Sequence, residues 1–391
     1  MTKTIPLSRM IVQNEFEVND EITLKLENGR TILYVDGKEF LQCKHLVIKG
    51  SLNELSKVEV NSIDDIENLD LEYSTEVDIT AAEEFWGHCS NLQAWAEHGF
   101  DSRLLHSNMS FPLLKELADV NPSKYETFFK EEICRRMIEG NPSTVYFLYE
   151  EGYIDRLTRD EFWSAFDFEV QPLIEIERRI NEISSEPIYF KHTTRTEDVA
   201  PITREKNDTY FQLDGKTITA LSLNELETLD DSLLVFILER LKKYLKIRAL
   251  NIYGCEKIES LPKEIGGLKN LKWLYLENNC ITSLPDTIGK LKQLEELYLA
   301  NNKLSSLPEG FSALYSLEFL DLSNNKFKNF GERGCDLRNL KNISLKNNEI
   351  NKIHPRFGKL KKLSILHIEG NALEGVPDFM QNMTNLKKIY K

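Results

Sequence analysis

Leucine recurs every 23 residues in the last third of the chain. The positions that set this period are Leu271, Leu294, Leu317, Leu340, Leu363 and Leu386. After each of the first five, apolar residues alternate as Leu-x-Leu, which is typical of a short strand with one buried face. An earlier repeat, one residue longer, starts at Ile247 and has Cys255 where the later repeats have asparagine. The pattern therefore predicts a repeat array over residues 247–391.

A single repeat of this kind exposes leucines that it cannot bury by itself. Stacked repeats form one continuous core and a parallel sheet. Each strand is followed by an asparagine in the same place of the template: Asn279, Asn302, Asn325, Asn348 and Asn371. We predict that these buried amides bond to turn backbone groups of their own repeat and of the adjacent one. A Leu-Pro pair such as Leu284-Pro285 ends the strand direction and begins the return segment.

The 23-residue unit with its LPxxIGxLxxL phrase resembles the leucine-rich-repeat superfamily, in the intracellular class that is often tied to Ras-type GTPase signalling. The resemblance covers residues 247–391. It implies a horseshoe-shaped solenoid that binds a protein, and it does not identify that protein.

The residues between the inward leucines are predicted to face solvent on the concave side. One row reads Asn251, Tyr275, Tyr298, Asp321, Ser344, His367 and Tyr390, and the row two residues earlier reads Ala249, Trp273, Glu296, Phe319, Asn342, Ile365 and Lys388. Aromatic residues gather in the first four repeats with acids beside them. Trp and Tyr are enriched among the residues that dominate binding energies. The candidate partner-binding residues are Tyr253, Trp273, Tyr275, Glu277, Glu296, Tyr298, Phe319 and Asp321.

The predicted binding face has two alternative interpretations. The aromatic residues could pack beneath the front part of the same chain, or they could have no binding role. If they bind a partner, the acids favour one whose apolar surface is rimmed by Lys or Arg.

The front of the chain lacks a period and is predicted from local signals. Residues 1–63 form a small β-rich unit, with tight turns at Asn28-Gly29 and Asp36-Gly37. Residues 80–182 form a helical domain that opens with a capping box of Thr80 and Glu83. Residues 183–209 form a linker, and residues 210–246 form an N-terminal cap of the array, with an amphipathic helix from Leu229 to Leu245. The predicted fold class is thus α/β, a leucine-rich-repeat solenoid preceded by a small β unit and a helical domain.

Two phrases of the front half carry a second resemblance. LYVDGKEFLQCKHLVI followed by FWGHCSNLQAWAEHGFDSRLLH looks like a module that precedes leucine-rich repeats in some archaeal proteins, some of which also carry a GTPase domain. The resemblance implies no activity beyond interaction. The chain has no GxxxxGK[ST] phosphate loop, so we do not expect it to be a GTPase itself.

The net charge of −14 is distributed unevenly, with an acidic front part and a mildly basic repeat array. Residues 247–391 carry 22 Lys+Arg and 16 Asp+Glu, which leaves 27 and 47 for residues 1–246. This acidic balance argues against nucleic acid as the main ligand. No apolar run is long enough for a signal peptide or a membrane span. The six cysteines have no disulfide or CxxC spacing, and we predict a cytoplasmic protein without a cofactor.

A cluster of histidines in the helical domain is the one candidate metal site. It comprises His88, Cys89, His98, Asp101 and His106, and none of its pairs has a usual zinc spacing. We therefore predict a non-enzymatic scaffold or adaptor with a protein-binding concave face. Three alternatives stay open: a regulator or effector of a small GTPase, an enzyme or metal site in the helical domain, and a self-assembling protein that associates through its C-terminal strand.

Overall fold

The computed structural model describes residues 14–40, 80–139, 141–166, 170–193, 209–214, 217–243, 246–330 and 332–391. Residues 41–63 of the predicted β-rich unit and residues 194–208 of the predicted linker lie outside these ranges. The chain divides into two compact units, Met1–Ala165 and Phe166–Lys391. Within the described ranges, no helix combines the length and apolar character that a bilayer crossing requires.

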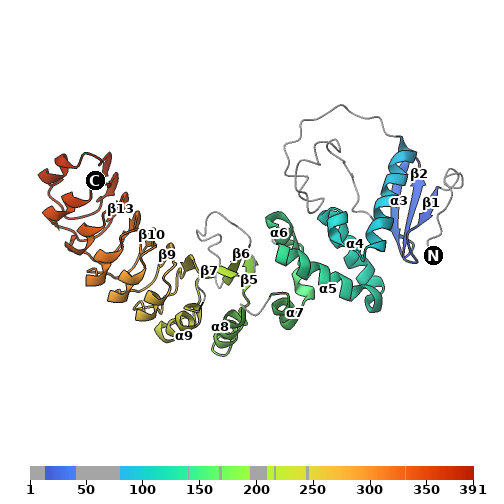
Figure 1. The fold of residues 1–391 in the computed structure, drawn as a ribbon, viewed down its shortest axis with the longest axis horizontal. Helices are drawn as coiled ribbons and strands as arrows, with labels where there is room; N and C mark the ends of the chain where they lie inside the picture. The colour runs from blue at the N-terminus through green and yellow to red at the C-terminus, as the bar shows by residue number, and fades with distance from the viewer. Residues whose placement is uncertain are drawn as a thin grey trace. The chain divides into compact units, whose positions relative to one another are not determined.

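A small antiparallel sheet opens the first compact unit (Figure 1). Its strands, in spatial order, are β1 (Glu15–Glu17), β2 (Ile22–Glu27), β3 (Arg30–Val35) and β4 (Lys38–Glu39). The predicted tight turns are confirmed: Asn28-Gly29 and Asp36-Gly37 join the strands, and all four residues have positive φ. This conformation suits two-residue hairpin turns, and it favours Asn, Asp and Gly.

Helices complete the first compact unit. They are α3 (Ala81–Glu97), η2 (Ser102–Leu104), α4 (Ser107–Val120), α5 (Pro122–Glu139), α6 (Pro142–Glu150), η3 (Tyr153–Arg156) and α7 (Arg159–Ser164). The predicted capping box at Thr80 and Glu83 is confirmed at the start of α3. The Glu21 carboxylate ties the sheet to α5, because it accepts hydrogen bonds from the Tyr125 hydroxyl at 2.6 Å and the Lys124 ammonium at 2.8 Å.

One sheet of ten strands runs through the described part of the second compact unit. Its strands are β5 (Lys191–Thr193), β6 (Thr209–Asp214), β7 (Thr217–Leu223), β8 (Ala249–Asn251), β9 (Trp273–Tyr275), β10 (Glu296–Tyr298), β11 (Phe319–Asp321), β13 (Asn342–Ser344), β15 (Ile365–His367) and β16 (Lys388–Tyr390). From β7 to β16 every pair is parallel. The predicted parallel sheet of the array is thus confirmed.

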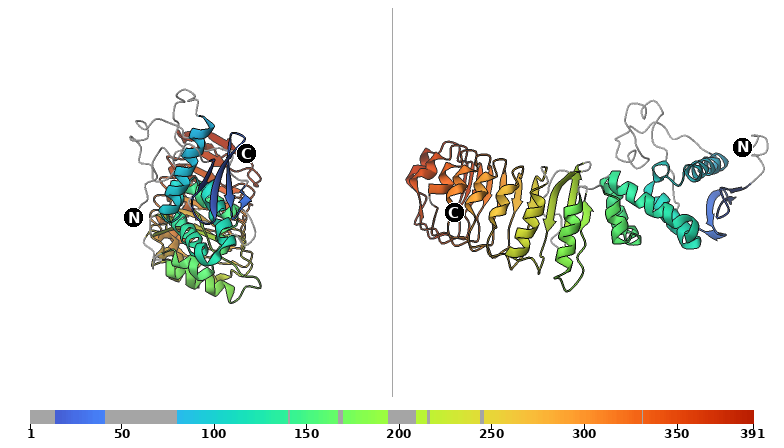
Figure 2. Two further views of the ribbon diagram at one scale, coloured as in Figure 1. Left: turned by 90° about the vertical axis from the view of Figure 1, so that its right-hand side faces the viewer. Right: turned by 60° about the horizontal axis from the view of Figure 1, so that its bottom comes forward.

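Short 3-10 helices carry the chain back from each strand to the next (Figure 2). They are η5 (Lys263–Gly267), η6 (Asp286–Lys290), η7 (Glu309–Ala313), η8 (Glu332–Asp336), η9 (Pro355–Lys359) and η10 (Asp378–Asn382). A two-stranded pair, β12 (Asn329–Phe330) and β14 (Lys352–Ile353), lies between strand and helix in two repeats. The leucines between strands and helices are almost completely buried except in the last repeat, where Leu373 is partly exposed, and they form the continuous core.

Two elements differ from the domain limits drawn from the sequence. The helix α8 (Gln171–Asn181) belongs to the second compact unit, although residues 80–182 were expected to form one helical domain. Strand β7 pairs in parallel with β8, so the sheet of the array extends before residue 247 into the region assigned to the cap. The helix α9 (Asp231–Leu241) lies within the amphipathic stretch and buries Leu233, Leu234, Ile237, Leu238 and Leu241.

The asparagine column has the role that the template predicts. The Asn279 amide donates to the carbonyl oxygens of Ile252 at 2.7 Å and Leu276 at 2.9 Å, and it accepts from the Cys255 N–H at 2.8 Å. One amide therefore bonds to its own repeat and to the preceding one. The same pattern continues through Asn302, Asn325, Asn348 and Asn371.

Candidate functional site

The two solvent-facing rows of the sheet have the register that the period predicts. Tyr275, Tyr298 and Asp321 are paired from strand to strand, and so are Trp273, Glu296 and Phe319. Side chains two residues apart on a strand share a face. The sheet therefore brings six of the eight candidate binding residues onto one patch of β9, β10 and β11.

Three aromatic rings of this patch form a continuous stack. The ring centroids of Tyr275 and Tyr298 are 4.8 Å apart with an interplanar angle of 18°. Tyr298 meets Phe319 at 4.7 Å and 32°. Tyr298 and Phe319 remain partly exposed, whereas Tyr275 is only 6% exposed. Tyr298 is thus the middle ring of the stack, and parts of Tyr298 and Phe319 remain accessible to solvent.

Two carboxylates lie beside the rings and bond only to neutral donors. The Tyr298 hydroxyl donates to Glu296 at 2.8 Å, and the Ser323 hydroxyl donates to Asp321 at 2.6 Å. Burial raises the pKa of the Tyr298 phenol, and the hydrogen bond to Glu296 raises it further. The phenol therefore stays protonated and holds the Glu296 carboxylate in place.

Two neighbouring carboxylates are instead paired with lysine. Glu295 lies 2.6 Å from the Lys272 ammonium, and Glu318 lies 2.6 Å from that of Lys341. Among the described residues, no Lys or Arg side chain lies within ion-pair distance of Glu296 or Asp321, nor over the ring of Tyr298 or Phe319. The negative charge beside the stack is thus left without a cation from the described residues.

Trp273 belongs to this patch, and the two remaining candidate residues lie around it. Trp273 is partly exposed, with the Lys272 ammonium 5.7 Å from its ring centroid. Tyr253 and Glu277 are also partly exposed and lie at the ends of the strands, where their carbonyl oxygens accept backbone hydrogen bonds from Glu225 and Gly254.

The prediction of solvent-facing rows is wrong for Tyr275, which is buried in the ring stack, and for the two row positions of β8. Ala249 and Asn251 on β8 are buried, with 0% and 1% of their surfaces exposed. The Asn251 amide donates to the Ser222 hydroxyl at 3.1 Å and to the Asn224 amide oxygen at 2.9 Å. Polar side chains of the preceding strand and turn therefore cover this end of the face, so the accessible patch begins at β9.

A second stacked pair lies further along the same row, and the sequence did not single it out. The His367 and Tyr390 rings are 4.2 Å apart and nearly parallel, at 1°. The Glu369 carboxylate lies 3.2 Å from His367 Nδ1 and 3.6 Å from the Lys346 ammonium. The signal was present, because both rings occupy one row of the period, but their neighbours on β13 are polar.

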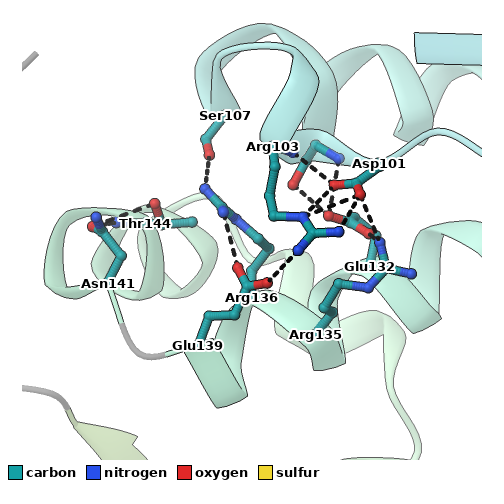
Figure 3. A network of polar contacts seen from close by, with 10 residues as sticks. Asp101, Arg103, Ser107, Glu132, Arg135, Arg136, Glu139, Asn141 and Thr144 are labelled. Carbon is teal, nitrogen blue, oxygen red and sulfur yellow. Dashed lines mark hydrogen bonds and ion pairs between the residues drawn. The ribbon is translucent and has the colours of Figure 1, made fainter. Parts of the chain in front are cut away.

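The residues of the candidate metal cluster make separate structural contacts. His106 caps α4 by accepting the Asn108 N–H at 3.1 Å, and the His98 ring lies 2.7 Å from the Ala94 carbonyl oxygen. Asp101 accepts from the Arg103 guanidinium, which lowers the pKa of its carboxyl (Figure 3). In the described ranges, no three His, Cys, Asp or Glu side chains form a group that could hold a metal ion.

The parallel strands, the asparagine column and the leucine core together match a known family. Residues 220–341 match the family model of a leucine-rich-repeat region. Residues 220–341 are therefore similar to leucine-rich-repeat regions. The match begins at the residue where β7 joins β8 in register, ahead of the array drawn from the 23-residue period.

Solved structures similar to this leucine-rich-repeat region come from bacteria and plants. The Leptospira interrogans leucine-rich-repeat protein LIC12759 is 32% identical over 44% of this chain and 47% of its own, with a TM-score of 0.39. The plant peptide hormone receptor RGFR1, in complex with RGF2, is 26% identical over 46% of this chain and 27% of its own, with a TM-score of 0.35.

A third similar structure is the leucine-rich-repeat ectodomain of the Arabidopsis thaliana receptor kinase GASSHO1/SCHENGEN3, in complex with CASPARIAN STRIP INTEGRITY FACTOR 2. It is 25% identical over 46% of this chain and 24% of its own, with a TM-score of 0.36. This chain thus covers less than half of each of these proteins. A comparison with curated proteins gives no match.

Proposed function

We propose that the leucine-rich-repeat region binds a protein partner on the solvent-facing side of β9, β10 and β11. The observation that carries this proposal is the stack of Tyr275, Tyr298 and Phe319, which presents two partly exposed rings beside carboxylates that pair with no Lys or Arg of the described residues. Exposed aromatic surface is costly in water, and burying such rings contributes much of the free energy of many protein interfaces. The rigid strands hold the rings in place, so little conformational entropy is lost on binding.

The role that fits this surface is that of a scaffold or adaptor. In this proposal the strand side is the concave face of a horseshoe. The protein acts in the cytoplasm, binds its partner and catalyses no reaction. A Ras-type small GTPase is a second candidate for the partner, favoured by the 23-residue period of the repeats. Titration of the full chain with such a GTPase, loaded with GDP or a non-hydrolysable GTP analogue, tests this second candidate by calorimetry.

Affinity capture with matched variants tests the proposed face. We expect the double variant Trp273→Ala/Tyr298→Ala to lose at least tenfold in recovery of the partner, since two ring surfaces of the patch disappear. The control Asn342→Ala/Ser344→Ala removes two partly exposed side chains of the neighbouring strand β13 and should bind like wild type. Thermal unfolding must show that both variants remain folded. Equal recovery by folded Trp273→Ala/Tyr298→Ala and wild type would contradict the proposal.

A further inference from the structure

Four side chains on β10 and β11 form a checkerboard of rings and carboxylates. Glu296 is paired with Phe319, and Tyr298 is paired with Asp321, in the parallel register of the two strands. Because the order is reversed between the strands, the two rings occupy one diagonal and the two carboxylates the other. The rings meet at 4.7 Å along their diagonal, and all four side chains are partly exposed. We call this group the ring–carboxylate square.

From this arrangement we infer that the ring–carboxylate square binds an arginine side chain of the protein partner. The inference rests on the proposed function, because it assumes that a polypeptide docks on this face. A guanidinium group lying over Tyr298 and Phe319 would meet the exposed parts of their rings, with a carboxylate on each side. Its flat fork of N–H donors can reach both carboxylates while the plane stacks on a ring.

Charge on the array favours a cationic occupant at this place. The neighbouring acids Glu295 and Glu318 each have a lysine of this chain at 2.6 Å. Glu296 and Asp321 accept hydrogen bonds from the hydroxyl groups of Tyr298 and Ser323 instead, and these donors leave the charge in place. The square therefore has two oriented anions whose counterion is not supplied by the described residues.

Other occupants fit the square less well. An acidic segment would face two uncompensated carboxylates, and like charges across an interface are unfavourable. A purely apolar side chain would cover the rings but would also strip water from carboxylates that it cannot pair. A lysine ammonium satisfies the charge, but it is a strongly hydrated point charge and lacks the planar surface that stacks on a ring.

Binding of defined peptides to the full chain tests the inference. The probes are three fluorescein-labelled decapeptides that alternate glycine with arginine, with lysine or with citrulline, measured by fluorescence anisotropy at physiological salt. Citrulline keeps the shape of arginine and removes its charge. We expect the arginine peptide to bind at least tenfold more tightly than the citrulline peptide, and several-fold more tightly than the lysine peptide.

Matched variants distinguish the square from the acidity of the chain as a whole. Glu296→Gln/Asp321→Asn should weaken binding of the arginine peptide about tenfold, and Tyr298→Leu, which keeps an apolar side chain, should weaken it several-fold. The control Glu295→Gln/Glu318→Gln removes the same number of negative charges from lysine-paired positions, and it should stay within about threefold of wild type. Circular dichroism melts establish that each variant is folded.

The outcomes separate this inference from the proposed function. Failure of the arginine peptide to bind, equal binding of the lysine or citrulline peptide, or equal losses in the two double variants would each overturn the arginine assignment. Loss of the captured partner from Trp273→Ala/Tyr298→Ala would still uphold the binding face in those cases. If that variant keeps the partner, the proposed function itself fails.

Discussion

The repeat array and the helical part of the first compact unit, residues 80–165, differ in how their buried polar groups are satisfied. We call the latter the helical unit. In the array, one neutral amide recurs in each repeat and bonds to backbone groups on both sides of a repeat boundary. In the helical unit, charged side chains are buried once, in a network without a counterpart elsewhere in the described residues of that unit. Recurring amides can join any number of stacked repeats, whereas a single charged network joins one particular set of helices.

Glu132 and Arg136 are the centre of the network in the helical unit (Figure 3). Each is only 2% exposed. The Glu132 carboxylate accepts the Ser102 N–H at 3.0 Å and pairs with Arg135, and the Arg136 guanidinium donates to Glu139 at 3.0 Å. The bond from Ser102 fastens η2, between α3 and α4, to α5, and the two other bonds lie within α5. The same asparagine interaction thus recurs at each repeat boundary of the array, whereas the charged network of the helical unit occurs at a single place.

The largest expected effect comes from removing one amide of the array. Asn325→Ala leaves the Leu304 N–H and the carbonyl oxygens of Leu299 and Leu322 without their partner in a buried place. We expect a loss of about 4 kcal/mol in the free energy of unfolding, since each unsatisfied buried group costs about 1–3 kcal/mol. Because repeats contact only their neighbours, hydrogen exchange should rise mainly on the two sides of Asn325.

An exposed asparagine of the same repeat provides the control. Asn329→Ala, on β12, should change the free energy of unfolding by less than about 0.5 kcal/mol. Uniform loosening of all repeats in Asn325→Ala would contradict a role confined to one boundary. Urea unfolding combined with hydrogen exchange measures both quantities.

What could be predicted from the sequence follows the same division. The period placed Tyr298 beside Asp321 and Glu296 beside Phe319, because a parallel register repeats at the spacing of the leucines. It missed β7, where Leu221 pairs with Leu250 outside the 23-residue spacing. It could not show that Asn251 is covered, since its partners Ser222 and Asn224 lie in that irregular segment.

In the first compact unit, sequence signals predicted only contacts between residues close together along the chain. The capping box and the two hairpin turns were predictable because each involves residues within a few positions of one another. The bond from Ser102 to Glu132 joins residues 30 positions apart, and no pattern connects them. The ring–carboxylate square was predictable in part. The sequence predicts its strand register, but only the structure shows that the described lysines pair with Glu295 and Glu318 and not with Glu296 or Asp321.

The next effect tests the charged network. Glu132→Leu removes the acceptor of the Ser102 N–H and the nearer of the two carboxylates that pair with Arg135, so we expect a loss of about 3 kcal/mol in the helical unit. Glu132→Gln keeps an oxygen acceptor in nearly the same shape and should cost about 1 kcal/mol. Hydrogen exchange resolved by segment checks that the loss lies in residues 80–165. Equal costs for Leu and Gln would show that packing rather than the acceptor matters.

The pH dependence of this pair of variants follows from burial. Burial raises the pKa of Glu132 above its ordinary value, against the opposing effect of Arg135. A raised pKa in the folded state means that this group's contribution to stability is present below the ordinary pKa and is lost as the pH rises through the raised one. Glutamine does not titrate. Glu132→Gln should therefore gain stability relative to wild type between pH 4 and pH 7, and a constant difference would contradict the raised pKa.

The smallest expected effect comes from glycine substitutions at equivalent positions of two repeats, which test whether these positions are packed alike. Gly289 and Gly358 occupy the same position of η6 and η9. A Cβ atom on Gly289 would lie 2.2 Å from the Gly310 carbonyl oxygen, whereas one on Gly358 would meet the Phe379 ring at an ordinary 3.7 Å. We expect Gly289→Ala to cost about 2 kcal/mol, because backbone of the next repeat must move. Gly358→Ala should change stability by less than about 0.5 kcal/mol in urea unfolding. Similar costs at both sites would mean that the period, rather than the local approach of neighbouring repeats, sets the tolerance of the array.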